Sequence, residues 1–339
     1  MAKEIRSAAE IKKQNVASIK RLILESESVT KPEVAEKTGL SVVTSGSILN
    51  ELTTSGFLVE ESLRLSSGGR PAMGYRLSEG AGNNLCLYTY TESDGTFIRY
   101  QVKDIAGKVK EEGFSQEEFV NINVLAQNIQ KICRPELDVK VVVIGIQGRI
   151  NHNIVESSDL IELVGHNIAN EIESITGIAT LVENDMNTIA LGYTQIHNDK
   201  LDSNELKNVA ILFFPQGQTP AGGYIVDGHI LRGATNLAGD LAFVPFNATK
   251  EERQLAYSQI ETARPLIDMF LISTTACLDP AVIVITGGLS NFLNESNLQG
   301  AIQQHLKRSY LPKVEVRPIM EDEYYAGLHS IAVDYLIDG

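Results

Sequence analysis

Asn184 and Asp185 stand side by side just after Glu183, which follows an apolar run at residues 179–182. An amide next to a carboxylate offers one hydrogen-bond donor and several acceptors, a set that suits the neighbouring hydroxyls of a sugar. The same two residue types are also among the strongest helix N-caps, and a helix is predicted at 186–196. The sequence leaves the hydroxyl-binding role and the capping role equally open.

Two glycine-containing loops follow apolar runs in the same way. Residues 145–148, which include Gln147 and Gly148, end the run 139–146, and residues 286–288 end the run 281–286. Ligands in α/β folds gather at the carboxyl ends of strands. We therefore expect both loops to line one site with Asn184 and Asp185, although ordinary turns also explain the glycines.

A second group of small polar residues lies near the N-terminus. A short helical pattern after Thr30 runs into Gly39, which tolerates the left-handed conformation that ends helices. Ser41 is placed to cap a second helix, whose buried stripe is Ile48, Leu49 and Leu52. Two short helices joined by a tight turn predict a helix-turn-helix, whose second helix enters the major groove of DNA.

The segments that follow predict a β-hairpin wing. Residues 57–61 and 75–77 read as strands around a turn at 66–71, with Arg70 at the tip, where a minor groove would attract it. The alternative is a plain helical hairpin with Arg70 in solvent. The predicted DNA-contacting residues are Ser41, Val42, Thr44, Ser45, Ser47, Gly69 and Arg70.

Charge is divided unevenly along the 339 residues. The whole chain carries a net charge of −14, yet residues 1–80 hold 11 Lys and Arg against 10 Asp and Glu, and the remainder holds 18 against 33. A strongly acidic part repels phosphate. We expect it to be held away from any bound DNA, and we expect only modest non-specific affinity from the nearly neutral N-terminal part.

Cysteine spacing and hydropathy predict a cytoplasmic protein. Cys86, Cys133 and Cys277 lie too far apart for a metal motif or a disulfide framework, so we expect reduced, buried thiols. No secretory signal is recognisable, and no apolar run reaches the ~18 residues of a membrane span. No metal, cofactor or membrane association is predicted.

The predicted elements after a linker at 79–84 alternate between strand and helix. Three strands (85–90, 97–103, 108–114) precede a helix, a buried strand, a helix, a strand and a helix. A second trio (208–214, 222–226, 229–232) precedes a helix at 251–276, a strand at 281–286 and a last helix at 322–337. A strand trio followed by helix and strand, occurring twice, predicts two related lobes around a cleft.

Several segments resemble the ROK family (repressors, open reading frames, kinases), and in particular its repressor branch of the xylose and N-acetylglucosamine type. Residues 182–192 are similar to the family's sugar-binding segment, and residues 223–240 to its second-lobe strand pair and loop. Residues 285–290 resemble its adenosine-side loop, and residues 68–71 the wing of its repressors. The resemblance implies an actin-like, ribonuclease-H-like α/β domain, a dimer or tetramer, Asp185 at the position of the catalytic base, and Asp240 in the sugar site.

Departures from the family pattern affect the sites for ATP and zinc. The first phosphate loop corresponds to residues 88–96, where one of its two glycines is lost and the acidic residue before the loop is not in place. The second reads Gly217 to Ala221, where Pro220 has no N–H and Gln218 obstructs a phosphate. The cysteine cluster of the family's zinc site is absent. We therefore expect no catalytic residues and no sugar kinase activity.

The predicted organisation has three parts: a winged helix-turn-helix at 1–78, the linker at 79–84, and a two-lobed ROK-like domain at 85–339. The lobes are expected at about 85–190 with 322–339, and at about 191–321. The expected function is a repressor of carbohydrate genes that binds operator DNA and is released by a sugar effector. The alternative is a regulator whose large domain serves only for dimerisation or binds another ligand. The predicted ligand-binding residues are Gln147, Gly148, Asn184, Asp185 and Asp240.

Overall fold

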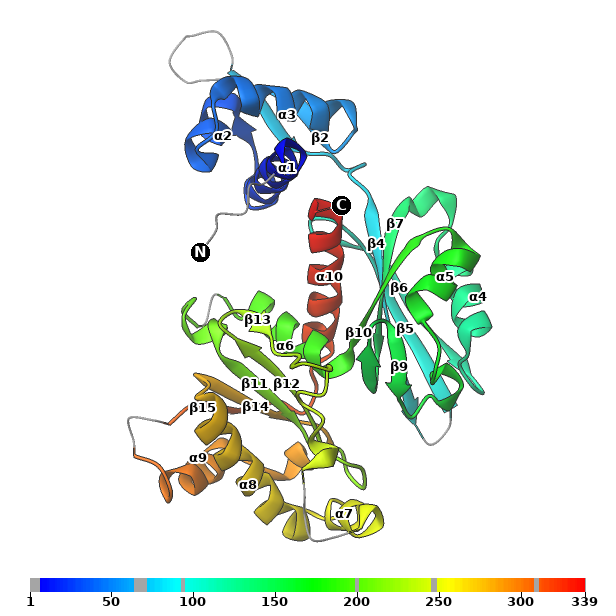
Figure 1. The fold of residues 1–339 in the computed structure, drawn as a ribbon, viewed down its shortest axis with the longest axis vertical. Coiled ribbons are helices and arrows are strands. Elements are labelled where there is room, and N and C mark those ends of the chain that lie inside the picture. The colour runs from blue at the N-terminus through cyan, green and yellow to red at the C-terminus, as the bar shows by residue number, and fades with distance from the viewer. Residues whose placement is uncertain are drawn as a thin grey trace.

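The computed structural model describes residues 7–63, 72–92, 95–198, 201–244, 249–307 and 311–338 (Figure 1). The segment that ends with β3 is called the head below. Its elements are α1 (Ala8–Leu24), β1 (Val29–Thr30), α2 (Lys31–Thr38), α3 (Val42–Thr54), β2 (Leu58–Leu63) and β3 (Ala72–Leu77). The three strands form one antiparallel sheet in the order β1-β3-β2.

Local capping sets the helix boundaries of the head. Thr30 caps α2 in a reciprocal capping box with Glu33, Gly39 ends α2 with φ 71°, and Ser41 caps α3 by accepting from the Thr44 amide. α1 ends at Leu24, shortly before β1. Ser26 turns its hydroxyl back to the Leu22 carbonyl, an alternative to further helical bonding.

Two five-stranded sheets with the same topology follow the head. The first has the order β10-β7-β4-β5-β6 and the second β13-β12-β11-β14-β15. Each begins with an antiparallel trio, and each adds a parallel strand beside the first strand of the trio and another parallel strand beyond it. The prediction of a repeated trio is confirmed, because the repeat lies in strand order and direction.

The elements of the first sheet and its helices run to residue 184. They are β4 (Asn83–Glu92), β5 (Gly95–Asp104), β6 (Val109–Glu117), α4 (Ile122–Ile132), β7 (Val139–Ile146), β8 (Arg149–Asn151), β9 (Ile154–Ser157), α5 (Ile168–Thr176) and β10 (Ala179–Asn184). β8 and β9 form a separate small hairpin. The sequence analysis did not predict this hairpin.

The second sheet and the remaining helices complete the chain. They are α6 (Asp185–Ile196), β11 (Val209–Phe213), β12 (Ala221–Val226), β13 (His229–Ile230), α7 (Lys250–Ala256), α8 (Ile260–Leu278), β14 (Val282–Thr286), α9 (Glu295–Gln303), β15 (Lys313–Val316) and α10 (Glu321–Asp338). α9 and β15 were not predicted. Four residues that begin with Lys and contain Glu give β15 a weak strand signal.

The predicted single helix at 251–276 is two helices. The break at residues 257–259 serves the loop between β11 and β12: the Tyr257 carbonyl accepts from the Gly217 amide (2.9 Å), and the Ser258 carbonyl accepts from the Gln216 side chain (2.9 Å). Tyr257 is buried. These long-range contacts use carbonyls that a continuous helix would bond internally.

The predicted linker is shorter than expected, because β4 begins at Asn83. Asn84 is buried within the first sheet, where its amide donates to the Lys103 carbonyl (3.2 Å) and its oxygen meets Nδ1 of His329 (3.2 Å). A polar side chain whose donor and acceptor are both satisfied can occupy a buried strand. The polar composition that favoured a linker therefore belongs partly to the sheet.

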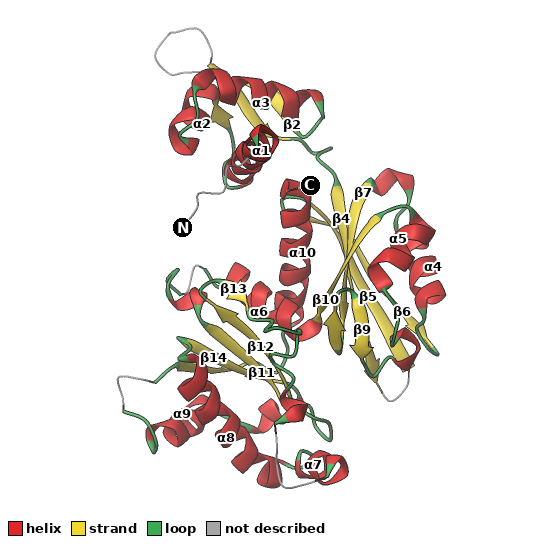
Figure 2. Ribbon diagram, viewed as in Figure 1, coloured by secondary structure: helices red, strands yellow, loops and turns green. Residues whose placement is uncertain are grey.

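Alternating strand residues build a layered core around α6 and α10 (Figure 2). In β7, Val142 and Ile144 belong to the cluster under α4 and α5, whereas Val141 and Val143 belong to the cluster under α10. The second sheet repeats this arrangement, with α8 and α9 on one face and α6 on the other. α6 and α10 therefore form the layer between the two sheets.

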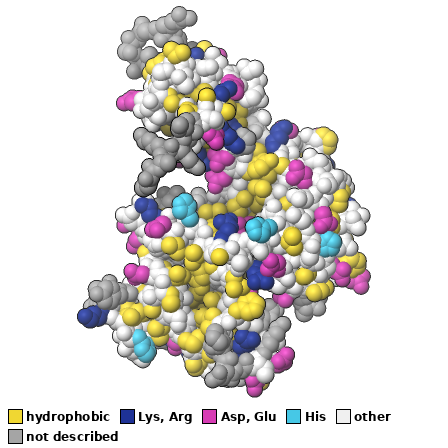
Figure 3. All heavy atoms as spheres, in the orientation of Figure 1, with side chains coloured by type: hydrophobic (Ala, Val, Ile, Leu, Met, Phe, Trp, Pro, Cys, Tyr) yellow, Lys and Arg dark blue, Asp and Glu magenta, His cyan; other side chains and the backbone are white. Residues whose placement is uncertain are grey.

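The surface mixes charges of both signs. Lys, Arg, Asp and Glu side chains are interspersed over the face seen in Figure 3. Among the described residues, no helix is both long enough and apolar enough to cross a membrane. Cys86 is buried and Cys277 is exposed, so the expectation of three buried thiols was wrong for Cys277.

Candidate functional site

Parallel pairing of β7 and β10 brings two of the predicted loops together. Asn184 is in register with Ile146 at the carboxyl ends of these strands, and the Asn184 amide donates to the Gly148 carbonyl at 2.6 Å. Gly148 has φ 128°, and a side chain there would clash with the Ser157 backbone. Only glycine allows this close approach between the loop and β9.

Asn184 is the N-cap of α6. Its Oδ1 accepts from the Asn187 amide (3.0 Å), and its Nδ2 donates both to Gly148 and to Oδ1 of Asp185 (3.0 Å). The oxygen and the nitrogen of this side chain are thus both engaged within the protein. The sequence left open whether Asn184 caps a helix or binds a ligand. The contacts of its side chain in this structure are those of a helix cap.

Asp185 is the first residue of α6 and is not its cap. Its Oδ1 accepts from the Met186 amide at 2.8 Å as well as from Asn184. Burial raises the pKa of the Asp185 carboxyl to about 7, and the nearby Asp159 carboxylate acts in the same direction against the hydrogen bonds. A carboxyl with such a pKa changes its charge close to neutral pH, as groups in binding sites often do.

Tyr324, the fourth residue of α10, packs against Gly145 near the end of β7, next to this site. Its hydroxyl is buried with no hydrogen-bond partner among the described residues, and it fills the space that a side chain at Gly145 would need. Burial and then the Asp185 carboxylate hold the pKa of Tyr324 well above its usual value. Tyr324 was not predicted as a site residue, because only tertiary packing brings α10 under the end of β7.

An ion pair and two hydrogen bonds lie beside Asp185, and two of these three contacts connect the two halves of the large domain. Glu183 at the end of β10 pairs with Arg232, which follows β13, and also accepts from the Asn187 side chain (3.0 Å). Asn236 donates to the Ile150 carbonyl in β8 (3.0 Å). These contacts hold the loop 231–240 of the second half against the loops of the first.

Asp240 lies in this same loop and is half-buried. Burial raises the pKa of its carboxyl, whereas the Ala242 amide and the Arg149 guanidinium lower it. Arg149 directly follows Gly148, so Asp240 faces the same loop that Asn184 binds. Gln147 is held by its backbone, whose carbonyl accepts from the Ser158 hydroxyl (2.6 Å).

The third predicted loop, 286–288, lies in different surroundings. Gly287 has φ 92° and packs on the Phe214 carbonyl, and Gly288 faces Gln216. Its neighbours are therefore the β11–β12 connection of the second sheet. Residues 145–148 and 184–185 thus lie together as expected, whereas the neighbours found for the third loop lie in the second sheet.

The α3 helix presents a mixed face to solvent. Val43 is 83% exposed and Val42 is 53% exposed, and Ser41, Ser47 and Asn50 are exposed as well. Thr44 is half-buried. Ser45 has no exposed surface, which corrects its predicted role at the DNA-facing side of the helix.

The position of Ser45 follows from the packing of α3 in the head. Ile48, Leu49 and Leu52 enter the core of the head, and Ser45 lies one turn before them on the same side. Gly46 is buried as well, with the Lys31 side chain 3.5 Å from where its Cβ would be. Gly69 and Arg70 lie outside the described residues.

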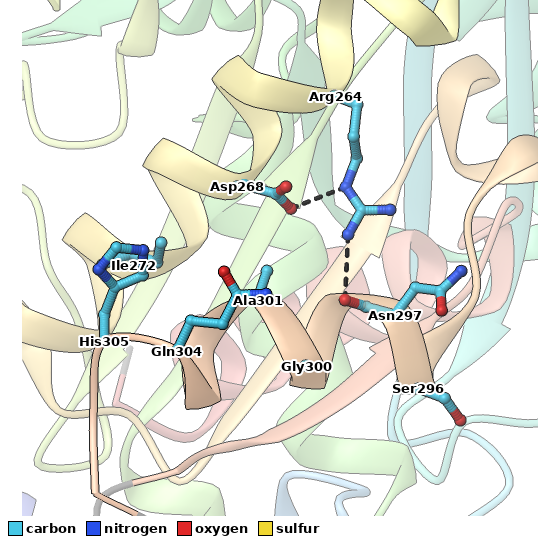
Figure 4. Close-up of a pocket in the computed structure, with 9 residues that line it drawn as sticks. All are labelled: Arg264, Asp268, Ile272, Ser296, Asn297, Gly300, Ala301, Gln304 and His305. Atoms are coloured by element: carbon cyan, nitrogen blue, oxygen red, sulfur yellow. Dashed lines mark hydrogen bonds and ion pairs between the residues drawn. The ribbon is translucent and has the colours of Figure 1, made fainter.

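Two hollows lie away from these residues. One of about 340 Å³ lies between α8 and α9, where Arg264 pairs with Asp268 at 2.8 Å and donates to the Asn297 carbonyl at 3.0 Å (Figure 4). The other, of about 380 Å³, lies between the head and residues 80, 81 and 140. In the described part of the chain, no group of three His, Cys, Asp or Glu residues is placed to hold a metal ion.

Comparisons with known proteins identify similar folds. No protein-family model and no curated protein matches the sequence. A ROK family transcriptional regulator, described as a homolog of the E. coli MLC protein, has a TM-score of 0.72 at 16% identity, covering 97% of this chain and 98% of its own.

Two further structures match the larger part of the chain. A Streptococcus pneumoniae ROK family protein in complex with sucrose has a TM-score of 0.59 at 15% identity, covering 75% of this chain and 99% of its own. A putative N-acetylmannosamine kinase from Listeria monocytogenes has a TM-score of 0.56 at 13% identity, covering 74% and 98%. This chain therefore has the mixed α/β fold of ROK family proteins.

Proposed function

We propose that this protein is a cytoplasmic, DNA-binding transcriptional regulator, a repressor of carbohydrate-utilisation genes whose large domain senses a sugar and assembles into a dimer or tetramer. One observation carries the proposal: a ROK regulator covers 97% of the chain, whereas the sucrose-bound ROK protein and the putative kinase cover 75% and 74%. The uncovered quarter corresponds in size to the 82 residues before β4. This agreement in size supports the inference that the head is the part that this chain shares with the regulator and that the two shorter matches lack.

The head has the elements of a winged helix-turn-helix. α2 and α3 are joined by a three-residue turn around Gly39 and Leu40, and the β2–β3 hairpin follows α3 as a wing would. Ser41 caps α3, and Ser41, Val42 and Val43 are exposed at its N-terminus, whereas Thr44 is half-buried and Ser45 is buried. An exposed helix N-terminus with small side chains can approach phosphates and base edges closely. Arg70 remains a predicted minor-groove contact.

The proposed DNA contact is tested by placing a negative charge on α3. Ser47→Glu should weaken binding to a duplex selected from a random library by about tenfold or more at fixed salt, because the carboxylate would face phosphates. Ser47 is exposed, so the fold should be unaffected. The matched control is Ser174→Glu on the exposed face of α5, which should bind as the wild type does. If the wild type enriches no duplex, or if both variants bind equally, the proposal is wrong.

The β11–β12 loop argues against sugar phosphorylation. The Gly217 amide already donates to the Tyr257 carbonyl, and Pro220 is buried and has no N–H. Neither residue can offer a backbone donor to a phosphate. We expect purified protein to release no ADP from ATP in the presence of monosaccharides. Sugar-dependent ADP release that disappears in Asp185→Asn would contradict this expectation.

The second candidate is a regulator whose large domain is only a dimerisation scaffold. One observation favours it: the oxygen and the nitrogen of Asn184 are already bonded to Asn187, Gly148 and Asp185. The raised pKa of Asp185 favours the sensor instead, because a buried carboxyl that titrates near neutrality is costly to keep without a use. The two candidates differ in whether a sugar binds at all and, if one does, in whether substitution of Asp185 weakens that binding.

A further inference from the structure

The C-terminal helix α10 holds the head at its far end. Lys20 of α1 donates to the carbonyls of Leu336 (2.8 Å) and Ile337 (3.2 Å) in the last turn of α10. Carbonyls in this position have no partner within their own helix, and a cation is favoured there by the helix dipole. Burial lowers the pKa of the Lys20 amine, an effect that the Asp338 carboxylate partly offsets.

An ion pair and an apolar contact surround this lysine. Arg21 reaches both carboxylate oxygens of Asp338, at 3.0 and 3.1 Å. The pair is about half exposed and by itself contributes little. Val333 and Leu336 of α10 also pack against the core of the head, which Ile105 joins from the turn after β5. The last two turns of α10 thus belong to the core of the head.

The first turn of α10 meets the candidate ligand site. Glu321 accepts from the Tyr88 hydroxyl (2.8 Å) and pairs with Arg99 (2.9 Å). The Tyr324 ring stacks on Tyr88 with centroids 4.5 Å apart, and its hydroxyl lies under Gly145, near Asp185. Whatever occupies the Asp185 region therefore lies beside the start of α10.

α10 and α6 pack backbone to backbone at two glycines. A Cβ at Gly192 of α6 would clash with the Glu323 carbonyl, and a Cβ at Gly327 of α10 would clash with the Thr188 carbonyl. Backbone against backbone leaves no side chain that could absorb a shift. Movement at the start of α6, where Asn184 and Asp185 lie, must be shared by α10.

We propose that α10 is a rigid connection between the Asp185 region and the head, so that a displacement at either end is transmitted to the other. Its 18 residues span about 27 Å as one helix (Figure 1). A hollow of about 380 Å³ lies beside Lys20, between the head and residues 80, 81 and 140. The regulatory meaning of this connection rests on the proposed function, whereas the connection itself does not.

Hydrogen exchange of the full-length protein, without DNA or sugar, tests the connection. Lys20→Met keeps the aliphatic stem and removes the charge. We expect about tenfold faster exchange in residues 334–338. We also expect exchange about two- to thirtyfold faster in residues 321–327, at the other end of α10, and in residues 184–190, at the start of α6.

The matched control is Lys12→Met on the same helix, because Lys12 pairs with Glu51 inside the head (2.8 Å) and does not contact α10. It should leave residues 184–190 unchanged. Val333→Ala, which removes an apolar contact between α10 and the core of the head, provides a second variant if Lys20→Met does not fold. Faster exchange confined to α1 and the last turn of α10 would overturn the connection. Failure to bind DNA, measured separately, would overturn only the proposed function.

Discussion

Replacing Gly327 with alanine is expected to lower the free energy of unfolding by about 2–3 kcal/mol, although alanine is the better helix former by about 1 kcal/mol. The added Cβ would overlap the carbonyl oxygen and carbonyl carbon of Thr188 in α6. These are backbone atoms, which cannot rotate away as the end of a side chain could. α6 cannot move away from α10 either, because its other side already packs closely on β12. A Cβ at Gly223 of β12 would clash with the Met186 carbonyl of α6.

Thermal melting followed by circular dichroism measures this effect. At an unfolding entropy of about 2.1 cal/mol/K per residue, a chain of 339 residues shifts by roughly 1.4 °C per kcal/mol, so the melting temperature should fall by about 3–4 °C. Gly300→Ala in α9 is the matched control, since a Cβ there meets nothing within 4 Å. It should stabilise the protein by up to about 1 kcal/mol. A Gly327→Ala protein that melts at or above the wild-type temperature would refute the tight crossing of α6 and α10.

Asp185→Asn is expected to produce a regulator that binds its operator but no longer responds to sugar. The effector is first identified by a thermal-shift screen of monosaccharides and sugar phosphates, in which a ligand at 100 times its Kd adds about 2.7 kcal/mol. A carboxylate that binds a sugar hydroxyl contributes ~1.5–3 kcal/mol, so the variant should lose about tenfold or more in effector affinity. Operator affinity without effector should not change.

The pH dependence of stability gives Asp185 a second readout. Its folded pKa of about 7 lies above the unfolded value of about 3.9, so the folded state binds the extra proton between these values. The protein should therefore lose stability as pH rises from about 4 to about 7, by on the order of 2–4 kcal/mol from this group. Asp185→Asn should remove that part of the slope.

Asp227→Asn is the matched control for both measurements, because Asp227 is exposed and its φ of 51° suits asparagine. It should leave effector affinity and the pH profile unchanged. Asp185→Ala removes the carboxyl altogether and should lose the effector as Asp185→Asn does. Full induction in both Asp185 variants would show that Asp185 does not bind the effector, whereas the absence of any stabilising sugar in the thermal-shift screen would favour the scaffold, in which the large domain only assembles the protein.

Local sequence determined much of the secondary structure. Ser41, Thr30 and Gly39 set helix boundaries through bonds and dihedral angles within a few residues, so their roles could be predicted without the fold. The alternation of apolar strands and helices likewise predicted the repeated α/β architecture, because strand and helix periods differ. Loops 145–148 and 184–185 could be placed together because parallel strands end at one edge of a sheet.

Tertiary contacts decided the rest. The break between α7 and α8 depends on Gly217, which is 40 residues distant from Tyr257, and the burial of Ser45 depends on which face of α3 the head encloses. Asn184 could be read as a cap or as a ligand, and only the fold places the Gly148 carbonyl within its reach. Neither Tyr324 beneath the site nor Lys20 at the end of α10 has a sequence signal, since each acts on residues at least 139 positions away. Such pairings arise only when packing brings distant backbone together, which no local pattern encodes.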